Sequence, residues 1–285
     1  MNVRMWSHKA TQENCKKLLT YGYKFLGPTE GQMACGEFGK GKMLSPKKIF
    51  KEIKDYFFKR DIVKNKKFKA LVTAGPTREY LDPVRFISNE SSGKQGYEIA
   101  LALNKLGIQT TLIAGPSNLI QQRSIKTKKV ITADEMFNEV KKTLPVDLAV
   151  CTAAVTDFKP AEKSKNKIKK DKLNFKSINF IKNNDILNFL SKNNKNRPQI
   201  VAGFSAETKS VVKNSLLKMK NKNCDLIFAN DVSKKNIGFN SDFNKVSIID
   251  QKGNIKIIPK NKKSFIANKI AQILLDKLID DRNIN

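Results

Sequence analysis

The chain has little of the side chains that build common metal centres and covalent catalytic groups. Its 285 residues contain one histidine, His8, and four cysteines that lie far apart in sequence, Cys15, Cys35, Cys151 and Cys224. This composition excludes a His-rich zinc centre, an HExxH protease and a Ser-His-Asp triad with a histidine to spare. The spacing of the cysteines excludes a dense disulfide framework.

Long apolar runs are also missing. No stretch approaches the ~18 consecutive apolar residues of a membrane-spanning helix, and the N-terminus lacks the charged, apolar and small-residue succession of a signal peptide. We therefore expect a cytoplasmic protein with no membrane partner. With 40% hydrophobic and 28% charged residues, the chain can build a core, and its length fits one large or two modest domains.

Acidic residues are outnumbered by basic ones. Lys and Arg total 55 against 26 Asp and Glu, a net charge of +29, which is typical of nucleic-acid binders. Such a binder would concentrate its basic residues on one face, with aromatic residues between them. Here lysine and asparagine dominate nearly every surface stretch, and even the expected helix over 261–280 mixes both signs. We predict no nucleic-acid partner and keep that class as the alternative, because an anionic small substrate fits the charge equally well.

The composition changes once along the chain. Residues 1–44 are rich in Gly, Met and aromatics. Residues 45–67 are predicted to form a lysine-rich helix and a basic linker. From residue 68 to 285, short apolar segments alternate with helical patterns. The expected strands lie at 69–75, 109–114, 147–152, 199–204 and 225–229, and the expected helices at 96–106, 133–144, 185–192 and 208–221. A hairpin over 245–250 and 255–259 and a helix over 261–280 follow. The pattern predicts an α/β fold, a Rossmann-like, mostly parallel sheet with helices on both faces and a C-terminal β-hairpin.

The loop after the first expected strand is long, running from Gly75 to Gly96. Ligands of doubly wound sheets bind at the carboxyl ends of the strands. Ser91, Gly93 and Gly96 could form an anion cradle at the start of a helix, or the hydroxyls could simply cap that helix. The segment matches neither GxGxxG nor GxxxxGK[ST], so it identifies no common nucleotide fold by itself.

Two later loops carry further candidates. Ala153 follows a strand and is small enough for close approach of a ligand, and Asp157 can bind a magnesium ion or a hydroxyl group. The lysine run 163–172 is either a solvated loop or a mobile clamp for a polyphosphate. Phe204, at the end of another strand, either stacks on a base or belongs to the core.

These loops resemble a known family. The similar segments are VTAGPTREYLDPVRFISNESSGKQG (72–96), TAAVTDF (152–158) followed by KIKK (167–170), AGFSAET (202–208), LIFANDVS (226–233) and GFNSDFNKV (238–246). They resemble the phosphopantothenate-cysteine ligase domain of the bacterial bifunctional enzyme of coenzyme A synthesis. The segments MNVRMW, ATQEN and ACGEFGKGKM within the first 43 residues resemble the end of the decarboxylase domain that precedes the ligase domain in that family.

The resemblance implies a CTP- and Mg²⁺-dependent ligase. The carboxylate of 4′-phosphopantothenate would attack the α-phosphate of CTP, and the cysteine amine would then displace CMP from the acyl-cytidylate to give phosphopantothenoylcysteine. Asn89 matches the asparagine that serves the acyl-cytidylate and its attack by cysteine, and Arg85, four residues earlier in the same motif, is a further expected catalytic residue. Lys167 matches the lysine that supports CTP binding and acyl-cytidylate formation.

Other residues would complete the nucleotide site. Asp157 matches the acidic residue of the nucleotide site and is expected beside magnesium. Lys218 and Lys222 match paired lysines that reach the triphosphate, and their i, i+4 spacing places them on one helix face. The resemblance also implies a homodimer formed through the ligase domain.

The decarboxylase resemblance is partial. In the family this domain binds FMN and yields 4′-phosphopantetheine, and its PxMNxxMW motif here begins at Met1 without the proline. Asn2 matches the residue that binds the substrate carboxylate, and Cys35 the one that protonates the enethiolate intermediate. His8 does not match the catalytic histidine. We expect a fragment or one half of a split gene, colourless and unable to decarboxylate alone.

Overall fold

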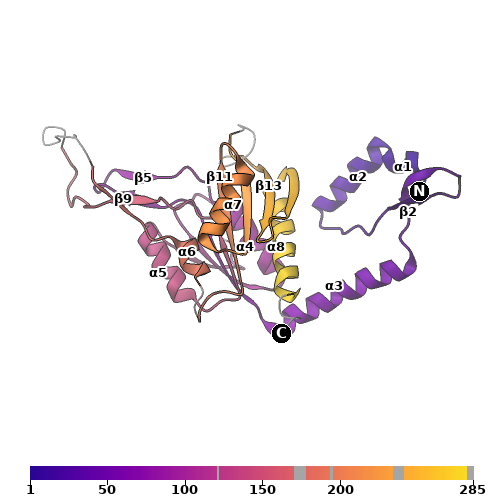
Figure 1. Cartoon of the computed structure of the whole chain (residues 1–285), viewed down its shortest axis with the longest axis horizontal. Helices are drawn as coiled ribbons and strands as arrows, with labels where there is room; N and C mark the ends of the chain where they lie inside the picture. Colours follow the sequence, from indigo (N-terminus) through magenta and orange to yellow (C-terminus); the bar gives the residue numbers. More distant parts are fainter. Residues whose placement is uncertain (121, 170–177, 193–194, 234–240, 281–285) are drawn as a thin grey trace. The chain divides into compact units, whose positions relative to one another are not determined.

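Figure 1 shows the computed structural model of the chain, which describes residues 1–120, 122–169, 178–192, 195–233 and 241–280. The last three residues of the lysine run, 170–172, and the start of the GFNSDFNKV segment, 238–240, lie outside these ranges. Contacts divide the chain into two compact units, Met1–Asn65 and Lys66–Asn285, which are described separately below.

The first unit is built from short helices and one hairpin. Its elements are α1 (Val3–Ser7), α2 (Lys9–Thr20), β1 (Thr29–Gln32), β2 (Phe38–Lys42) and α3 (Pro46–Lys66), with β1 and β2 antiparallel. Helix α1 lies against β2, where two glycines leave room for it. A Cβ added at Gly41 would lie 2.6 Å from the backbone oxygen of Met1, and one at Gly39 would lie 3.1 Å from the side chain of Val3.

The basic stretch before the second unit differs from the prediction. Instead of a helix followed by a linker over 45–67, helix α3 continues to Lys66. Between Lys47 and Lys66 there is no glycine or proline to interrupt it. The helix ends where Lys67 takes the left-handed conformation, with φ +46°.

The second unit contains an eight-stranded sheet in the order β14-β13-β12-β11-β8-β3-β6-β7. The neighbouring pairs from β12 to β7 are parallel, whereas β13 pairs antiparallel with both β12 and β14. The predicted mostly parallel sheet with a C-terminal hairpin is therefore confirmed. The strands are β3 (Lys69–Ala74), β6 (Gln109–Ala114), β7 (Lys126–Lys129), β8 (Leu148–Cys151), β11 (Ile200–Glu207), β12 (Leu226–Asp231), β13 (Phe243–Asp250) and β14 (Ile255–Lys262).

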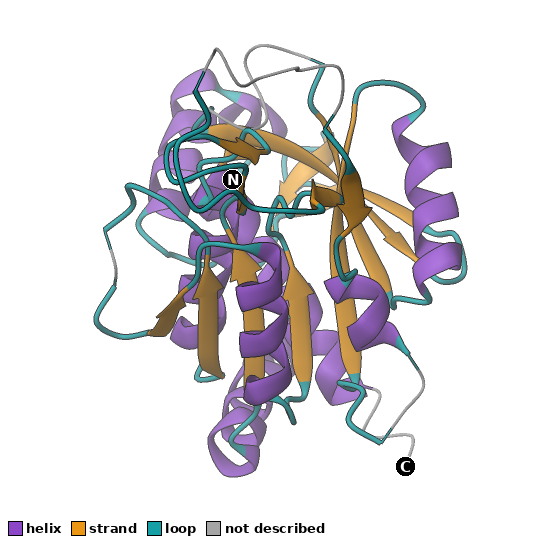
Figure 2. Cartoon of the chain, turned by 90° about the vertical axis from the view of Figure 1, so that its left-hand side faces the viewer, coloured by secondary structure: helices purple, strands orange, loops and turns teal. Residues whose placement is uncertain are grey.

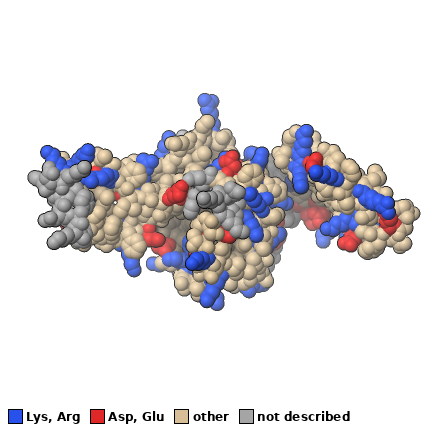
Figure 3. Space-filling model, turned by 90° about the horizontal axis from the view of Figure 1, so that it is seen from above, with Lys and Arg blue, Asp and Glu red and all other residues tan. Residues whose placement is uncertain are grey.

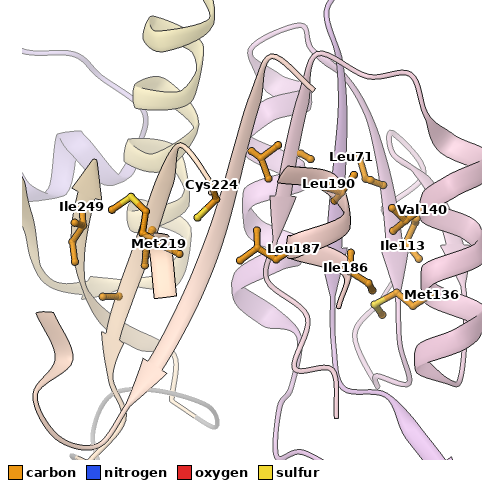
Figure 4. Packing of buried hydrophobic residues seen from close by; sticks show 14 of the residues in the cluster. Leu71, Ile113, Met136, Val140, Ile186, Leu187, Leu190, Met219, Cys224 and Ile249 are labelled. Atoms are coloured by element: carbon orange, nitrogen blue, oxygen red, sulfur yellow. The ribbon is translucent and has the colours of Figure 1, made fainter. Parts of the chain in front are cut away.

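Helices cover both faces of this sheet (Figures 1 and 2). Helices α4 (Lys94–Lys105) and α8 (Lys263–Asp280) pack on one face and on each other, and α5 (Ala133–Thr143), α6 (Ile186–Ser191) and α7 (Val211–Lys222) pack on the other. Figure 4 shows the buried side chains between the sheet and the latter three helices, among them Leu71, Ile113, Met136, Leu190 and Met219. Apolar residues at helical spacing place one side of each helix in this core.

The strand order defines where a ligand can bind. From β3 at the centre, the chain moves outward to β6 and β7, then returns to β8 on the other side of β3 and continues to β11. The connections after β3 and β8 therefore lead in opposite directions, and such a point in an open α/β sheet opens a crevice at the carboxyl ends of the strands. The functional candidates in the loops after these two strands lie at this crevice.

Both loops contain hairpins that the sequence did not predict. Strands β4 (Arg78–Tyr80) and β5 (Phe86–Ser88) pair antiparallel, as do β9 (Phe158–Pro160) and β10 (Phe180–Lys182). Strand β4 contacts β9, so the two loops lie side by side beyond the main sheet (Figure 1). Three-residue strands are too short to show an alternating pattern in the sequence.

Gly96 offers a test of how closely α4 approaches the sheet. A Cβ at this buried position would lie 2.2 Å from Thr152 Oγ1 and 2.6 Å from the Cβ of Ala74. The Thr152 hydroxyl is held, because it donates to the backbone oxygen of Thr73 at 2.5 Å. In an exposed helix, Gly→Ala would stabilise by about 1 kcal/mol, but here we expect Gly96→Ala to lower the free energy of unfolding by about 1–3 kcal/mol through overpacking.

Urea unfolding followed by circular dichroism measures this difference. Lys105→Ala, at an exposed position in the last turn of the same helix, is the control and should change stability by less than about 0.5 kcal/mol. A Gly96→Ala variant as stable as the unaltered protein would contradict the close packing.

Candidate active site

The floor of the crevice is formed by the two loops joined through their backbones. Ala154 donates its N–H to the oxygen of Gly75 at 2.9 Å, and Pro76 forms a parallel bridge with Ala154. The hydroxyls of Thr77 and Thr156 lie 3.3 Å apart, and the Thr156 N–H donates to Thr77 Oγ1 at 3.2 Å. Both threonines are buried. The loops after β3 and β8 thus form one connected support for the residues above them.

Asn89 joins the two loops through its side chain. Its Nδ2 donates to the backbone oxygens of Val155, at 3.0 Å, and Ala154, at 3.4 Å. Next to it, Ser88 Oγ donates to the oxygen of Thr77 at 2.7 Å. The exposed Asn89 is therefore oriented at the crevice, between the ends of β3 and β8, where a reacting group could meet both loops.

The serines and glycines before α4 have local roles in the structure. Gly93 is the N-cap residue, with φ +75°, and a Cβ there would lie 3.0 Å from the Gly75 backbone. Ser91 Oγ accepts from the Gly93 N–H at 3.2 Å, and Ser92 Oγ accepts from the Lys94 N–H at 3.4 Å. The two hydroxyls thus stabilise local turns before the helix, whose N-cap residue makes no side-chain capping hydrogen bond. The same N-terminus offers its dipole to an anion.

A cavity of about 340 Å³ opens in front of this helix N-terminus. Its most polar contribution is Arg78, whose guanidinium lies 4.6 Å from the centre of the Phe86 ring. A cation surrounded by hydroxyl groups suits a polar anion. The lining residues are Pro76, Arg78, Phe86, Ser88, Ser91, Ser92, Pro116, Ser117, Asn118 and Leu119.

Sequence reasoning missed Arg78, Ser117 and Asn118 in this cavity. The signal was available for the latter two, because the segment GPSN follows directly after β6, the neighbour of β3. The Ser117 hydroxyl donates to the backbone oxygen of Ser92 at 3.0 Å, which connects this segment to the start of α4.

Arg85 is engaged by a buried carboxylate rather than pointing freely into the crevice. Its Nε and Nη2 donate to Asp82 Oδ2 at 2.9 and 2.7 Å, and Nη2 also donates to the backbone oxygen of Ile168 at 2.7 Å. Burial opposes ionisation of Asp82. Hydrogen bonds from the N–H groups of Val84 and Arg85 and from the guanidinium outweigh it, so the pKa of this carboxyl lies well below its usual range.

Lys167 lies beside this pair, in the loop between β9 and β10. The side chain is exposed, and the neighbouring Ile168 accepts from Arg85 and donates to Asp82. The structure thereby brings Arg85 and the backbone next to Lys167 together. A cationic side chain at this place is free to follow an anionic ligand.

The other nucleotide-site candidates come from β11 and α7. Lys218 Nζ donates to the backbone oxygen of Phe204 at 2.8 Å, so these two candidates meet. The half-buried Phe204 ring lies 5.2 Å from the ring of the buried Phe228, so Phe204 contacts the core as well as the surface. Lys222 instead forms an ion pair with Asp185, the N-cap residue of α6. Strand β11 continues to Glu207, so Phe204 lies within the strand and not at its end as predicted. Of the contacts described for the two lysines, the one to β11 comes from Lys218.

Asp157 is exposed at the start of the loop after β8, four residues beyond Ala153. In the described part of the chain, no cluster of three or more His, Cys, Asp or Glu residues could hold a metal ion. Mg²⁺ commonly binds through one or two carboxylates, substrate phosphates and water. Asp157 fits that mode, in which a nucleotide would supply the remaining ligands.

A second charged group lies at the N-terminus of α4. Lys94 Nζ forms an ion pair with Asp242 Oδ1 at 2.6 Å. Burial of the nearby Lys263, followed by the charge of Lys94, lowers the pKa of Lys263 to about 8. The start of α4 therefore carries an ion pair, next to a buried lysine that loses its proton more readily than an exposed one.

In the first unit, the two decarboxylase candidates have different surroundings. Asn2 Oδ1 accepts from the Met5 N–H at 2.8 Å and so caps α1. Cys35 lies exposed in the turn between β1 and β2, with Sγ 4.0 Å from a carboxylate oxygen of Glu37. Glu37 also pairs with Arg4 at 3.0 Å, which links the hairpin to α1.

Figure 3 shows how the described basic residues are distributed on one face of the molecule. On the face drawn in Figure 3, Lys and Arg are scattered and interspersed with acidic and uncharged residues. Helix α8, predicted to mix both signs, packs its apolar side on the sheet. Within the described ranges no helix is both long and apolar enough to cross a membrane.

The sheet order and its covering helices define a Rossmann-like α/β domain, and comparisons with known proteins agree with this fold. The family model described as "DNA/pantothenate metabolism flavoprotein C-terminal domain" matches residues 65–278, and the "Flavoprotein" model matches residues 1–58. The chain belongs to the family of the coenzyme A biosynthesis bifunctional protein CoaBC. It is 41% identical over 276 residues to the CoaBC protein of Borreliella burgdorferi, covering 96% of this chain and 69% of the relative. With the Escherichia coli protein it shares 38% identity over 292 residues, covering 99% and 69%.

Solved structures show the same fold. The C-terminal domain of a CoaBC protein superimposes with a TM-score of 0.63 at 32% identity, covering 75% of this chain and 96% of that domain. A Cab2 mutant in complex with phosphopantothenate-cysteine gives a TM-score of 0.60 at 16% identity, covering 84% of this chain and 97% of Cab2, which shows likeness of fold alone. The chain is thus an α/β member of a family of coenzyme A biosynthesis enzymes.

The reactivity of the cysteine thiols tests how their surroundings differ between the two units. Burial raises the pKa of both Cys151 and Cys224 to about 12, whereas Cys35 is exposed in a turn. Because the thiolate is the reactive form, iodoacetamide at about pH 8 should label Cys35 long before Cys151 and Cys224. Peptide mass spectrometry of the native and urea-unfolded protein measures the order. Labelling of Cys224 in the native protein as fast as Cys35 would contradict the packing of α7 on the sheet.

Proposed function

We propose that the second unit is a phosphopantothenate-cysteine ligase that uses CTP and Mg²⁺. The observation that carries this is Asn89, which bridges the loops after β3 and β8 at the crevice of a domain belonging to the CoaBC family. The cavity beside it offers a guanidinium and several hydroxyls at a helix N-terminus, which suits phosphorylated substrates.

The first half-reaction joins the acid to the nucleotide. A carboxylate oxygen of 4′-phosphopantothenate bonds to the α-phosphorus of CTP, and the bond to the bridging oxygen breaks to release pyrophosphate. Lys167 supplies mobile positive charge as negative charge develops on the phosphates. Ser91, Gly93 and the start of α4 hold the phosphates through the serine hydroxyl, the close approach that glycine allows and the helix dipole. Mg²⁺, held at Asp157, would neutralise phosphate charge during this step.

The second half-reaction transfers the acyl group. The cysteine amine attacks the acyl carbon, the bond to the phosphate oxygen breaks, and CMP leaves. Asn89 orients the acyl phosphate, because its amide is fixed on the backbone of the β8 loop. On the nucleotide side, we assign Ala153 to close approach of the nucleotide, Phe204 to stacking on the base, and Lys218 and Lys222 to the triphosphate.

Three further proposals follow from the family. The ligase units pair as a homodimer, and the protein works in the cytoplasm on small molecules. In a longer protein of the length of its relatives, of which this chain covers 69%, FMN would bind in the part that the chain does not cover. Asn2 and Cys35 would then contact the acyl-cysteine substrate, as its carboxylate ligand and as the acid that protonates the intermediate, to give 4′-phosphopantetheine.

The ligase proposal predicts a specific substrate requirement. Purified protein with CTP, Mg²⁺, 4′-phosphopantothenate and cysteine should release pyrophosphate and CMP continuously. Without cysteine, release should stop after one equivalent per site, because the acyl-cytidylate has no acceptor. A coupled pyrophosphate assay follows both, with ATP replacing CTP to test the choice of nucleotide. CTP consumption that does not depend on phosphopantothenate would contradict the assignment.

Substitutions at Lys167 and Asn89 should separate the half-reactions. Lys167→Gln removes the positive charge that faces the phosphates. Acyl-cytidylate formation should therefore slow, with a loss of about 2–4 kcal/mol of transition-state stabilisation. Asn89→Asp places a negative charge beside the acyl phosphate while leaving Lys167 in place, so the intermediate should form and accumulate. Rapid quench with labelled phosphopantothenate distinguishes the two variants.

Lys105→Gln is the matched control, an exposed lysine at the far end of α4, and should keep the rates of the unaltered protein. Equal behaviour of the Lys167 and Asn89 variants would contradict the division of roles even if the ligase activity is present.

A further inference from the structure

The carboxylate of Asp82 is completely buried and surrounded by donors. Oδ1 accepts from the N–H groups of Val84 and Arg85, both at 2.8 Å, which closes a tight turn over residues 82–85. Oδ2 accepts from Nε and Nη2 of Arg85 and from the N–H of Ile168, the last at 3.3 Å. The two oxygens therefore have separate tasks, one within the turn and one toward a segment 86 residues further along the chain.

Residues 163–169, called the lysine loop here, dock on this turn at both of their ends. At one end, the Ser164 N–H donates to the oxygen of Leu81 at 2.9 Å, and Lys163 Nζ lies 5.1 Å from the centre of the Tyr80 ring. At the other end, both backbone groups of Ile168 are held, its N–H by Asp82 and its C=O by Arg85. Lys167 lies between these two anchor points.

We propose that Asp82 and Arg85 form a positioning pair that fixes the backbone on the C-terminal side of Lys167 and so places this lysine at the nucleotide phosphates. This inference rests on the proposed ligase function, and it gives Arg85 a role through the loop in place of the catalytic contact expected from the sequence. The Ile168 N–H belongs to the peptide unit that follows Lys167, so its hydrogen bond fixes the orientation of that peptide. A lysine side chain has a flexible four-carbon stem, which can be aimed reproducibly only from a fixed Cα.

The same pair also connects Lys167 with Asn89, the residues proposed for the two half-reactions. Arg85 is followed directly by β5 (Phe86–Ser88), and Asn89 follows β5. The turn that docks the lysine loop therefore also begins the segment that carries Asn89 to the β8 loop. The groups proposed for acyl-cytidylate formation and for its aminolysis share one buried anchor.

Asp82→Asn tests the docking with little other change. The amide oxygen of asparagine can still accept from Val84 and Arg85, so the turn persists, but an NH₂ group now faces the Arg85 guanidinium and the Ile168 N–H. The new NH₂ group, the guanidinium and the backbone N–H then face one another with no acceptor between them. Because the Arg85 side chain is 39% exposed, its charge can turn to water, and we expect the variant to fold. Arg85→Lys, which keeps the charge but loses the planar fork, is the second variant.

Amide hydrogen exchange of the peptide containing Ile168 measures the docking of the lysine loop independently of any enzyme activity. We expect this peptide to exchange at least about tenfold faster in Asp82→Asn, while peptides of β3 and β8 keep their protection. Asp225→Asn is the matched control. Asp225 also binds an arginine, Arg197, through both oxygens and accepts from a backbone N–H, that of Val201, but it precedes β12 at the opposite end of the parallel strands.

A double-mutant cycle tests whether the pair acts through Lys167. The rate of pyrophosphate release should fall on the order of tenfold to a hundredfold in Asp82→Asn. In a Lys167→Gln background, the same substitution should cost almost nothing further, because the lysine that it positions is gone. The Asp225→Asn control should leave both the exchange of the Ile168 peptide and the rate unchanged.

Unchanged exchange of the Ile168 peptide in Asp82→Asn would overturn the docking. Equal losses of rate in the presence and absence of Lys167 would show that Asp82 acts by another route and would overturn the positioning role. If the unaltered protein releases no pyrophosphate, the ligase proposal fails and the catalytic part of this inference fails with it. An active protein whose Asp82 variant behaves like the Asp225 control contradicts this inference alone.

Discussion

The pairing of β3 with β8 is the interaction on which the site depends. These parallel strands lie in register from Ala70 opposite Leu148 to Thr73 opposite Cys151, and Val72 and Val150 are buried at their centre. The pairing continues past the strand ends through the Pro76–Ala154 bridge and the buried Thr77–Thr156 contact. Because the chain leaves β3 and β8 in opposite directions, this pairing both opens the crevice and holds its two walls together.

Above that floor, the functional side chains are held by polar contacts. Asn89 donates hydrogen bonds to backbone oxygens of the loop after β8. The lysine loop is hydrogen-bonded to Asp82 and Arg85 through the backbone of Ile168. Such loops bury few apolar side chains, so each hydrogen bond contributes a large part of their order. This accounts for an arginine and a buried aspartate next to a site that we propose to bind anions. The two opposite charges pair with each other and hold the backbone of Ile168, and in the proposed mechanism Lys167 is the cation that contacts the ligand.

The sequence predicted the sheet well because its central strands are buried on both faces. The apolar runs of β3, β6 and β8 stand out from their surroundings, and glycine after α4 marks its end. Edge strand β7, with the sequence KTKK, and the three-residue strands of the two extra hairpins carry no such pattern, so they were missed. Helix α3 extends through a lysine-rich segment that composition suggested to be a linker.

At the site, residue types were predictable but partners were not. Hydroxyls, glycines and lysines could be assigned to anion binding from the sequence, whereas the contact between Asp82 and Ile168 joins two loops that only the fold brings together. Asp82 precedes a proline, and nothing in its neighbouring sequence indicates a contact with Ile168. Gly96, predicted to approach a ligand, has a packing role against Thr152 that no local pattern reveals.

The central claim is that an acyl-cytidylate forms at the crevice between β3 and β8. Phosphopantothenate labelled with heavy oxygen in its carboxylate tests it most directly, with the masses of the products measured after turnover with CTP and cysteine. Because the carboxylate attacks the α-phosphate and CMP leaves with the bridging oxygen, one labelled oxygen should appear in CMP. Label found in free phosphate together with CDP would show attack on the terminal phosphate and would contradict the account.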